Sequence, residues 1–229
     1  MNPALRRSAA HVFVESIAAP TLSADDLHHL SRVLRLRDGE VVSASDGAGQ
    51  WRLCRFIVSG ELRPDGDVVS GVPRGEVLTV GWAIPKGDRP EWIVQKLTEI
   101  GIDHIVLVDA ERSIVHWDPA KVERQLDRLR KVAREASMQS RRIWLPEITA
   151  PLPTAQLAGP GVAIADPDGG PITAAVSTVL IGPEGGWSPA ELTHFDTSVG
   201  LGPTILRVET AALVAATLLT ARREGLTTL

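Results

Sequence analysis

Cysteine is almost absent from this chain of 229 residues, since Cys54 is the only one. A single thiol excludes a disulfide within the chain and a zinc site built from cysteines. The longest apolar stretch, 211–219, is too short for a membrane-spanning helix, which needs about 20 residues. The N-terminal residues, MNPALRRSAAHVFVES, lack the apolar core of a secretory signal. These absences predict a cytoplasmic protein with no membrane partner and no metal site.

The common phosphate-binding motifs are missing as well. The chain contains neither G-x-x-x-x-G-K-[ST] nor G-x-G-x-x-G. A net charge of −4 argues against a general nucleic-acid coat protein. Charge is nevertheless uneven: residues 1–75 carry nine arginines, no lysine and nine acids, and residues 121–142 carry eight basic residues against three acids. Because arginine binds phosphate through a planar fork, such a local cluster matters more than the total.

The first 75 residues predict short strands separated by turns. The candidate strands are 11–14, 40–46, 51–59 and 67–72. One helix interrupts them, with Ser23 as its N-cap and Asp38-Gly39 as its stop. Several short strands with one helix suggest a small β-barrel, and 70–76 is a plausible linker to the rest of the chain.

From residue 77 onward, expected strands alternate with expected helices. The strands are 77–85, 104–110, 161–166 and 178–182, and the helices are 88–101, 118–139 and 210–225. The segment 150–161 is expected to be a connecting loop with a short helix. This alternation is typical of an α/β domain with a mostly parallel sheet.

The helix over 118–139 carries two stripes at helical spacing. The apolar stripe consists of Val122, Leu126, Leu129, Ala133 and Ala136. The basic stripe consists of Lys121, Arg124, Arg128 and Lys131. The basic stripe is open to two interpretations, a contact with RNA phosphates or an ordinary solvated helix face.

The stretch VLIGPEGGWSPAEL, residues 179–192, joins a buried strand to a glycine loop and a helix start. Ser188 as N-cap, Pro189 at the first helical position and Glu191 three residues after Ser188 form a capping box. Glycines let a ligand approach the backbone, and free amides at a helix start point toward it. Taken alone, the loop is equally compatible with a tight structural turn.

A second glycine loop that leads into a helix lies in VGLGPTILRVETAALVAA, residues 199–216. Two such loops in one half of the chain are much less plausible as structural turns alone. Together, IGPEGG and LGPTILRVETA resemble the cofactor loops of SPOUT methyltransferases, the knotted S-adenosylmethionine enzymes. Three further segments resemble the RsmE family, which methylates N3 of one uridine in small-subunit (16S) ribosomal RNA. They are HHLSRVLRLRDGE (28–40), KGDRPEWIVQKLTEIGIDHIVLVDAERS (86–113) and REASMQSRRIWLPEI (134–148).

The resemblance covers nearly the whole chain and implies its architecture. It implies a PUA-like RNA-binding β-barrel over 1–73 and an α/β domain with a parallel sheet and a SPOUT-type trefoil knot over 74–229. It also implies a homodimer with S-adenosylmethionine as cofactor and 16S rRNA or the small ribosomal subunit as partner. The missing loop lysine agrees with this cofactor, which has no phosphate.

The resemblance also implies which residues form the sites. The cofactor-binding set is Ala165, Ile181, Gly182, Pro183, Glu184, Gly185, Gly186, Leu201, Gly202, Leu206, Thr210 and Ala211. The candidate RNA-binding residues are Arg32, Arg35, Arg37, Arg112, Arg124, Arg128, Glu135, Gln139 and Arg142. Glu135, Gln139 and Arg142 belong to the matched segment 134–148, whereas Arg124 and Arg128 come from the basic stripe and Arg32, Arg35 and Arg37 from the end of the first helix. Trp187, beside the first loop, is a candidate to close over the cofactor.

Arg207 and Glu209 are the candidate catalytic residues. Uracil N3 carries a proton at neutral pH, so methylation needs a general base or a cation that stabilises the uracil anion. Glu209 is equally suited to cap the last helix or to pair with Arg207. Two other readings of the whole chain stay open: a SPOUT methylase of another RNA, such as a transfer-RNA ribose methylase, and a non-catalytic RNA-binding module.

Overall fold

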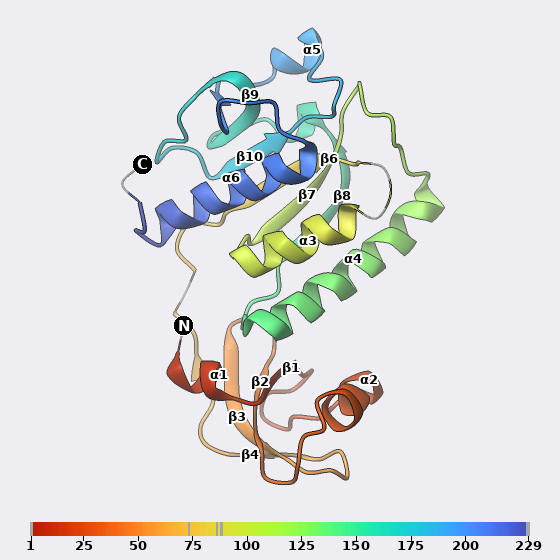
Figure 1. The fold of residues 1–229 in the computed structure, drawn as a ribbon, viewed down its shortest axis with the longest axis vertical. Helices are drawn as coiled ribbons and strands as arrows, with labels where there is room; N and C mark the ends of the chain where they lie inside the picture. Colours follow the sequence, from red (N-terminus) through yellow and green to blue (C-terminus); the bar gives the residue numbers. More distant parts are fainter. Residues whose placement is uncertain (1, 73, 86, 88, 228–229) are drawn as a thin grey trace. The chain divides into compact units, whose positions relative to one another are not determined.

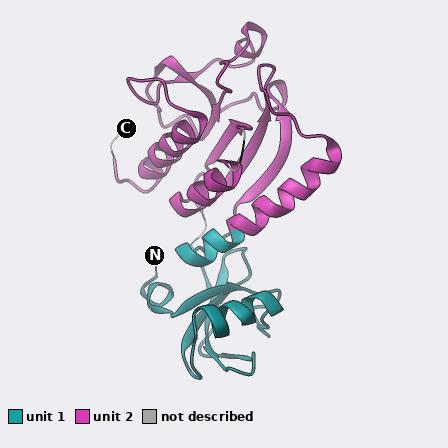
Figure 2. Cartoon of the chain, turned by 45° about the vertical axis from the view of Figure 1, so that its right-hand side comes forward, with its two compact units in different colours: residues 1–73, 134–145 teal, residues 74–133, 146–229 magenta. Residues whose placement is uncertain are grey.

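The computed structural model describes residues 2–72, 74–85, 87 and 89–227, and these residues form two compact units. The first unit contains residues 1–73 together with 134–145, and the second contains 74–133 and 146–229 (Figure 2). The first unit therefore includes a segment, 134–145, that the expected division at residue 73 assigned to the second domain. Each unit has its own apolar core.

The first unit is built on a five-stranded sheet. Its elements before residue 73 are helix α1 (Pro3–Arg7), β1 (Ala10–Phe13), α2 (Ala24–His28), the π-helical turn η1 (His29–Val33), β2 (Val41–Ser45), β3 (Gln50–Phe56), β4 (Leu62–Pro64) and β5 (Val69–Ser70). The strand order is β1-β2-β3-β4, with β5 also paired to β3. Leu30, Val42, Cys54 and Phe56 are fully buried beneath it. Helix α1 and strand β4 were not among the expected elements.

The helix expected to run to Asp38 ends earlier, and its last turns show why. Ser23 caps α2 as expected, because its side chain accepts a hydrogen bond from the Asp26 amide. Arg35 then adopts the left-handed conformation, with φ of 55°. The Leu36 amide donates to the Leu30 carbonyl at 2.9 Å, so the chain turns back on the π-helical turn after a left-handed residue, a position where glycine is usual.

Segment 134–145 is held in the first unit by charged and polar contacts. Arg134 donates to both carboxylate oxygens of Asp26, at 3.0 and 2.7 Å, and to the Phe13 carbonyl at 3.1 Å. Burial raises the pKa of Asp26, but the hydrogen bonds from Arg134 and Ser23 outweigh it and leave that pKa below its usual value. An acid that is ionised and paired at neutral pH fixes this segment against the sheet.

The second unit is an α/β domain with a six-stranded, wholly parallel sheet (Figure 1). Its strands are β6 (Thr79–Ala83), β7 (His104–Asp109), β8 (Glu147–Pro153), β9 (Val162–Gly170), β10 (Thr178–Ile181) and β11 (Ser198–Val199), in the order β11-β9-β10-β6-β7-β8. Its helical segments are α3 (Arg89–Ile100), α4 (Pro119–Ser140, whose last turns belong to the first unit), η2 (Thr154–Gln156), α5 (Pro189–Leu192) and α6 (Val208–Arg223). Buried side chains such as Trp82, Leu97, Leu107 and Leu219 fill its core.

The expected α/β pattern is confirmed, with one correction. The segment 150–161 was expected to be a loop with a short helix, but its first residues belong to strand β8. Pro151 and Pro153 are tolerated there because β8 is the edge strand of the sheet. Only η2 matches the expected short helix. Asp88, the expected first residue of the helix over 88–101, lies outside the described residues.

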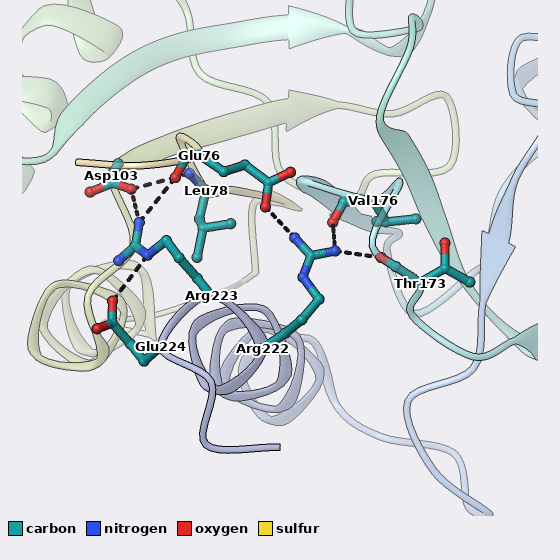
Figure 3. Close-up of polar contacts among 8 residues, drawn as sticks. All are labelled: Glu76, Leu78, Asp103, Thr173, Val176, Arg222, Arg223 and Glu224. Atoms are coloured by element: carbon teal, nitrogen blue, oxygen red, sulfur yellow. Dashed lines mark hydrogen bonds and ion pairs between the residues drawn. The ribbon is translucent and has the colours of Figure 1, made fainter. Parts of the chain in front are cut away.

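Helix α6 is anchored at its C-terminal end by two consecutive arginines. Arg223 pairs with the buried Asp103, which also accepts from the Leu78 amide at 3.1 Å (Figure 3). Arg222 pairs with Glu76 and donates to the Val176 carbonyl at 2.7 Å (Figure 3). Because these partners lie at the strand-entry edge of the sheet, the helix is fixed at the end opposite to its glycine-loop start.

Candidate functional site

A cavity of about 270 Å³ opens at the carboxyl ends of β9 and β10, close to the about 300 Å³ at which small-molecule sites begin. Ligands of open parallel sheets bind at this edge of the strands. The lining residues come from the two glycine loops, the end of β9 and the start of α6. They are Ala165, Asp166, Pro167, Ile181, Gly182, Pro183, Glu184, Gly186, Trp187, Leu201, Gly202, Thr204, Ile205, Leu206, Val208 and Ala211.

The first loop, 182–188, is shaped by Trp187. Its indole N–H donates to the Ala165 carbonyl at 3.1 Å, and the ring is buried. A Cβ on Gly182 would lie 2.9 Å from the indole ring, closer than a real contact allows. Gly182 is therefore required by the tryptophan that packs on it, and the tryptophan joins the loop to β9.

The expected capping box closes this loop. The Glu191 amide donates to Ser188 Oγ at 3.1 Å, and the Ser188 amide donates to Glu191 Oε2 at 2.8 Å. Glu191 is buried and also accepts from the Glu111 amide at 3.0 Å, which ties the loop to the end of β7. Arg112 donates to the Gly185 carbonyl at 3.1 Å. These bonds hold the loop in place before a ligand enters.

A bulge in β9 brings a further segment to the cavity. The pairing of β11 with β9 jumps from Ile164 to Gly170 between two adjacent residues of β11. Residues 165–169 consequently arch out of the ladder, and the Asp168 amide donates to Asp166 Oδ1 at 2.9 Å. Asp166 and Pro167 reach the cavity in this way, although the sequence analysis did not select them.

The second loop leads into α6, where Arg207 and Glu209 lie. Arg207 is the N-cap residue, exposed, and its side chain forms no ion pair within the residues that the structure describes. Glu209 Oε1 lies 3.6 Å from Arg89 Nε, and its Oε2 is buried without a hydrogen-bond partner in the described chain. Neither side chain lines the cavity, but Val208 between them does. The two candidates therefore flank a lining residue without lining the cavity themselves, and Glu209 pairs with Arg89 rather than with Arg207.

Most of the expected cofactor residues line one cavity. Gly185 and Thr210 are the exceptions, because Gly185 faces Arg112 and Thr210 is an exposed residue of α6. Thr204, Ile205 and Val208 are lining residues that the expected set lacked. They lie inside the quoted motif LGPTILRVETA, so a reading of the complete loop would have included them.

The cavity suits a cofactor of a particular charge. Its walls are mainly apolar, its charged side chains are the carboxylates of Asp166 and Glu184, and no lysine, arginine or histidine lines it in the described part of the chain. Carboxylates repel phosphate and attract a cation. A cofactor with a sulfonium and no phosphate, such as S-adenosylmethionine, fits this set of groups.

The expected RNA-binding residues fall into both units. Arg32, Arg35, Arg37, Glu135, Gln139 and Arg142 belong to the first unit, and Arg112, Arg124 and Arg128 belong to the second. In the first unit, Arg32, Arg35, Arg37, Glu135 and Gln139 are exposed, and Arg142 is half-buried. Arg112 acts as a brace for the cofactor loop through its bond to Gly185.

The two stripes of α4 differ in the structure as expected. Leu126, Leu129, Ala133 and Ala136 are buried. In the basic stripe, Arg124 is exposed, whereas Arg128 Nε lies 2.7 Å from Glu91 Oε1 of helix α3. The Arg128 side chain remains 63% exposed, so the pair leaves it accessible to a phosphate.

Among the described residues, no group of three or more His, Cys, Asp and Glu side chains could hold a metal ion. No helix in that part of the chain is long and apolar enough to cross a membrane.

Comparison with known proteins assigns both units to families. A model of the RNA methyltransferase domain matches residues 73–220, and a model of the PUA domain of RNA methyltransferases matches residues 22–65. Ribosomal RNA small subunit methyltransferase E of Mycobacterium bovis is 33% identical over 221 residues, which cover 86% of this chain and 84% of that protein. The protein of the same name from Bacillus subtilis is 29% identical over 231 residues, which cover 86% and 88%.

A solved structure agrees with the fold. Ribosomal RNA small subunit methyltransferase E from Neisseria gonorrhoeae, bound to S-adenosyl methionine, is similar with a TM-score of 0.77 at 25% identity, over 93% of this chain and 97% of that one. The expected fold class, a SPOUT-like α/β domain with an N-terminal PUA domain, is confirmed. The chain belongs to the family of RNA methyltransferases whose curated members are named ribosomal RNA small subunit methyltransferase E.

Proposed function

We propose that this protein transfers the methyl group of S-adenosylmethionine to N3 of a specific uridine in 16S rRNA during ribosome maturation. The observation that carries the proposal is the single cavity formed by both glycine loops, whose charged groups are carboxylates and which suits a cationic, phosphate-free cofactor. The bound cofactor supplies an electrophilic methyl group on its sulfonium. Family membership supports ribosomal RNA as substrate.

Arg207 and Glu209, which flank the lining residue Val208, are assigned to the proton of uracil N3. Glu209, with one carboxylate oxygen free of hydrogen bonds in the described chain, accepts this proton. Arg207, exposed and unpaired among the described residues, stabilises the negative charge that develops on the uracil ring. Arg89 pairs with Glu209 at the first turn of α6, one residue after Val208, which lines the cavity.

The two proposed domains, 1–73 and 74–229, take different tasks. Residues 1–73, the PUA-like domain, bind RNA through the exposed Arg32, Arg35 and Arg37, whose phosphate contacts position the RNA without reading its sequence. Residues 74–229, the methyltransferase domain, bind the cofactor and form the trefoil knot and the homodimer of the SPOUT class. The protein works in the cytoplasm, where ribosomes mature.

Mass spectrometry of 16S rRNA nucleosides from a strain without this protein tests the proposal. N3-methyluridine should be absent, should return with the intact gene, and should not return with Gly186→Val. Loss of a ribose methylation instead would identify a methylase of another type. No change in any nucleoside, together with no binding of S-adenosylmethionine, would identify a non-catalytic RNA-binding module.

The assignment of Glu209 and Arg207 can be tested in the purified enzyme. Glu209→Gln should lower kcat by about 10²–10⁴-fold and remove the acidic limb of its pH profile, as expected for a general base. Arg207→Gln should lower kcat at every pH and keep the shape of the profile. A Glu209→Gln enzyme with normal kcat would restrict Glu209 to its structural contact with Arg89.

A further inference from the structure

The cofactor cavity has an unusual balance of charge. Asp166 and Glu184 line it, and no cationic side chain from the described chain does. Neither carboxylate forms an ion pair with a described residue. Asp166 is half-buried and Glu184 is exposed, and no cationic side chain of the described residues neutralises their charge at the cavity.

The Asp166 side chain is held by the backbone, and the exposed Glu184 belongs to a fixed turn. Asp166 is half-buried, and the Asp168 amide holds its Oδ1 at 2.9 Å, which leaves Oδ2 for a ligand. Glu184 lies in the tight turn that the Gly186 amide closes on the Pro183 carbonyl at 2.8 Å. The two carboxylates come from different segments, the β9 bulge and the first glycine loop.

We propose that Asp166 and Glu184 make the cavity select the sulfonium cofactor over its thioether product. This inference rests on the proposed function. When the methyl carbon leaves sulfur for uracil N3, the electron pair of the broken bond stays on sulfur, the N3 proton leaves to a base, and the sulfur loses its positive charge. S-adenosylmethionine thus carries one more positive charge than S-adenosylhomocysteine, and only that charge distinguishes the two for a carboxylate.

The consequence is release of product. A negatively charged cavity holds the reactant more tightly than the product, so the spent cofactor dissociates and inhibition by it is weak. The same carboxylates favour the cationic ground state, so they raise affinity without raising kcat. A carboxylate that binds the ribose hydroxyls or the amino group, both common to the two cofactors, would instead contribute equally to each.

Isothermal titration calorimetry separates these roles, with S-adenosylmethionine, S-adenosylhomocysteine and the cationic analogue sinefungin as probes. Asp166→Asn keeps an oxygen for the Asp168 amide, and Glu184→Gln keeps the length of the side chain. Each change should raise the dissociation constants of S-adenosylmethionine and sinefungin about three- to tenfold, and should leave that of S-adenosylhomocysteine within about twofold of its original value. Asp168→Asn is the matched control, because Asp168 lies in the same bulge but does not line the cavity, and it should change no affinity.

Added salt gives a second readout. The preference of the intact protein for S-adenosylmethionine over S-adenosylhomocysteine should decrease as potassium chloride is raised, because salt screens exposed charges. If Asp166→Asn and Glu184→Gln lower the affinity for all three probes equally, or lower none of them, the inference is overturned while the proposed function stays intact. If the unmodified protein binds none of the probes, the proposed function itself fails.

Discussion

His11 provides a quantitative test of how the first unit is held together. Its ring is 1% exposed and bridges the sheet to segment 134–145: Nδ1 lies 2.8 Å from Ser43 Oγ, and Nε2 lies 2.9 Å from the Arg142 carbonyl. A carbonyl can only accept, so Nε2 carries the proton and Nδ1 accepts from the Ser43 hydroxyl in the neutral ring. Protonation of Nδ1 would place a second donor in this buried site.

The pKa of His11 follows from these surroundings. Burial lowers it from 6.5 to about 4, with the charges of Arg141 and Arg134 acting in the same direction and the hydrogen bond to the Arg142 carbonyl opposing them. Because the folded pKa lies below the unfolded value, the unfolded chain binds the proton first as pH falls. The contribution of His11 is complete above pH 6.5 and is lost progressively down to pH 4. At 1.36 kcal/mol per pH unit, the loss is about 3 kcal/mol in the free energy of unfolding.

Hydrogen exchange measured by mass spectrometry on peptides from β1 and β2 reports the unfolding of this unit directly. The free energy obtained from these amides should fall by about 3 kcal/mol between pH 6.5 and pH 4 after correction for intrinsic exchange. In His11→Gln, which retains a donor for the Arg142 carbonyl, most of that slope should disappear. His28→Gln is the matched control, because His28 is exposed, and it should keep the slope. A His11 ring that titrates near pH 6.5 in an NMR experiment would refute the reasoning.

Three other predictions concern the cofactor, the assembly and the RNA. Gly186→Val should abolish detectable binding of S-adenosylmethionine in calorimetry while the circular dichroism spectrum stays unchanged. Gly186 has φ of 69°, and a β-branched residue there would distort the loop. Gly66→Val, with φ of 112° in the first unit, is the control and should bind the cofactor normally. Sedimentation at micromolar concentration should show a homodimer, and a fully active species of 24.5 kDa would contradict it. Arg124→Gln should lower the slope of log affinity for RNA against log salt by about 0.7–0.9 without moving the methylated position. Arg128→Gln should lower this slope by less, because Glu91 already neutralises part of the Arg128 charge. Equal slopes in the two variants and the unmodified protein would make the basic stripe a solvated face.

Local rules predicted the parts of the site that depend on neighbouring residues. Ser188, Pro189 and Glu191 are adjacent in sequence, and the capping box they form is present as expected. The apolar stripe of α4 and the parallel strands were predictable for the same reason, since a helix or strand repeats its pattern over a few residues.

The features that the sequence did not disclose depend on distant partners. The β9 bulge that brings Asp166 to the cavity arises from pairing with β11, about 30 residues later. The early end of the first helix depends on a left-handed Arg35, which no propensity rule favours over glycine. Strand β8 contains two prolines and would be a loop by local preference, but the parallel sheet accepts it at its edge.

Helix α4 has a consequence for the order in which the chain folds. The residue pair Asp26 and Arg134 is separated by 108 positions, and His11 reaches the carbonyl of Arg142 across 131. A ribosome releases the first 73 residues long before it adds segment 134–145, so the N-terminal sheet emerges with Asp26 and His11 still lacking their partners. The unit that is first in sequence can complete its structure only after residues 74–133 of the second unit have been synthesised. A nascent chain stopped at residue 110 should therefore leave the N-terminal sheet sensitive to protease, and one extended past residue 145 and clear of the exit tunnel should protect it.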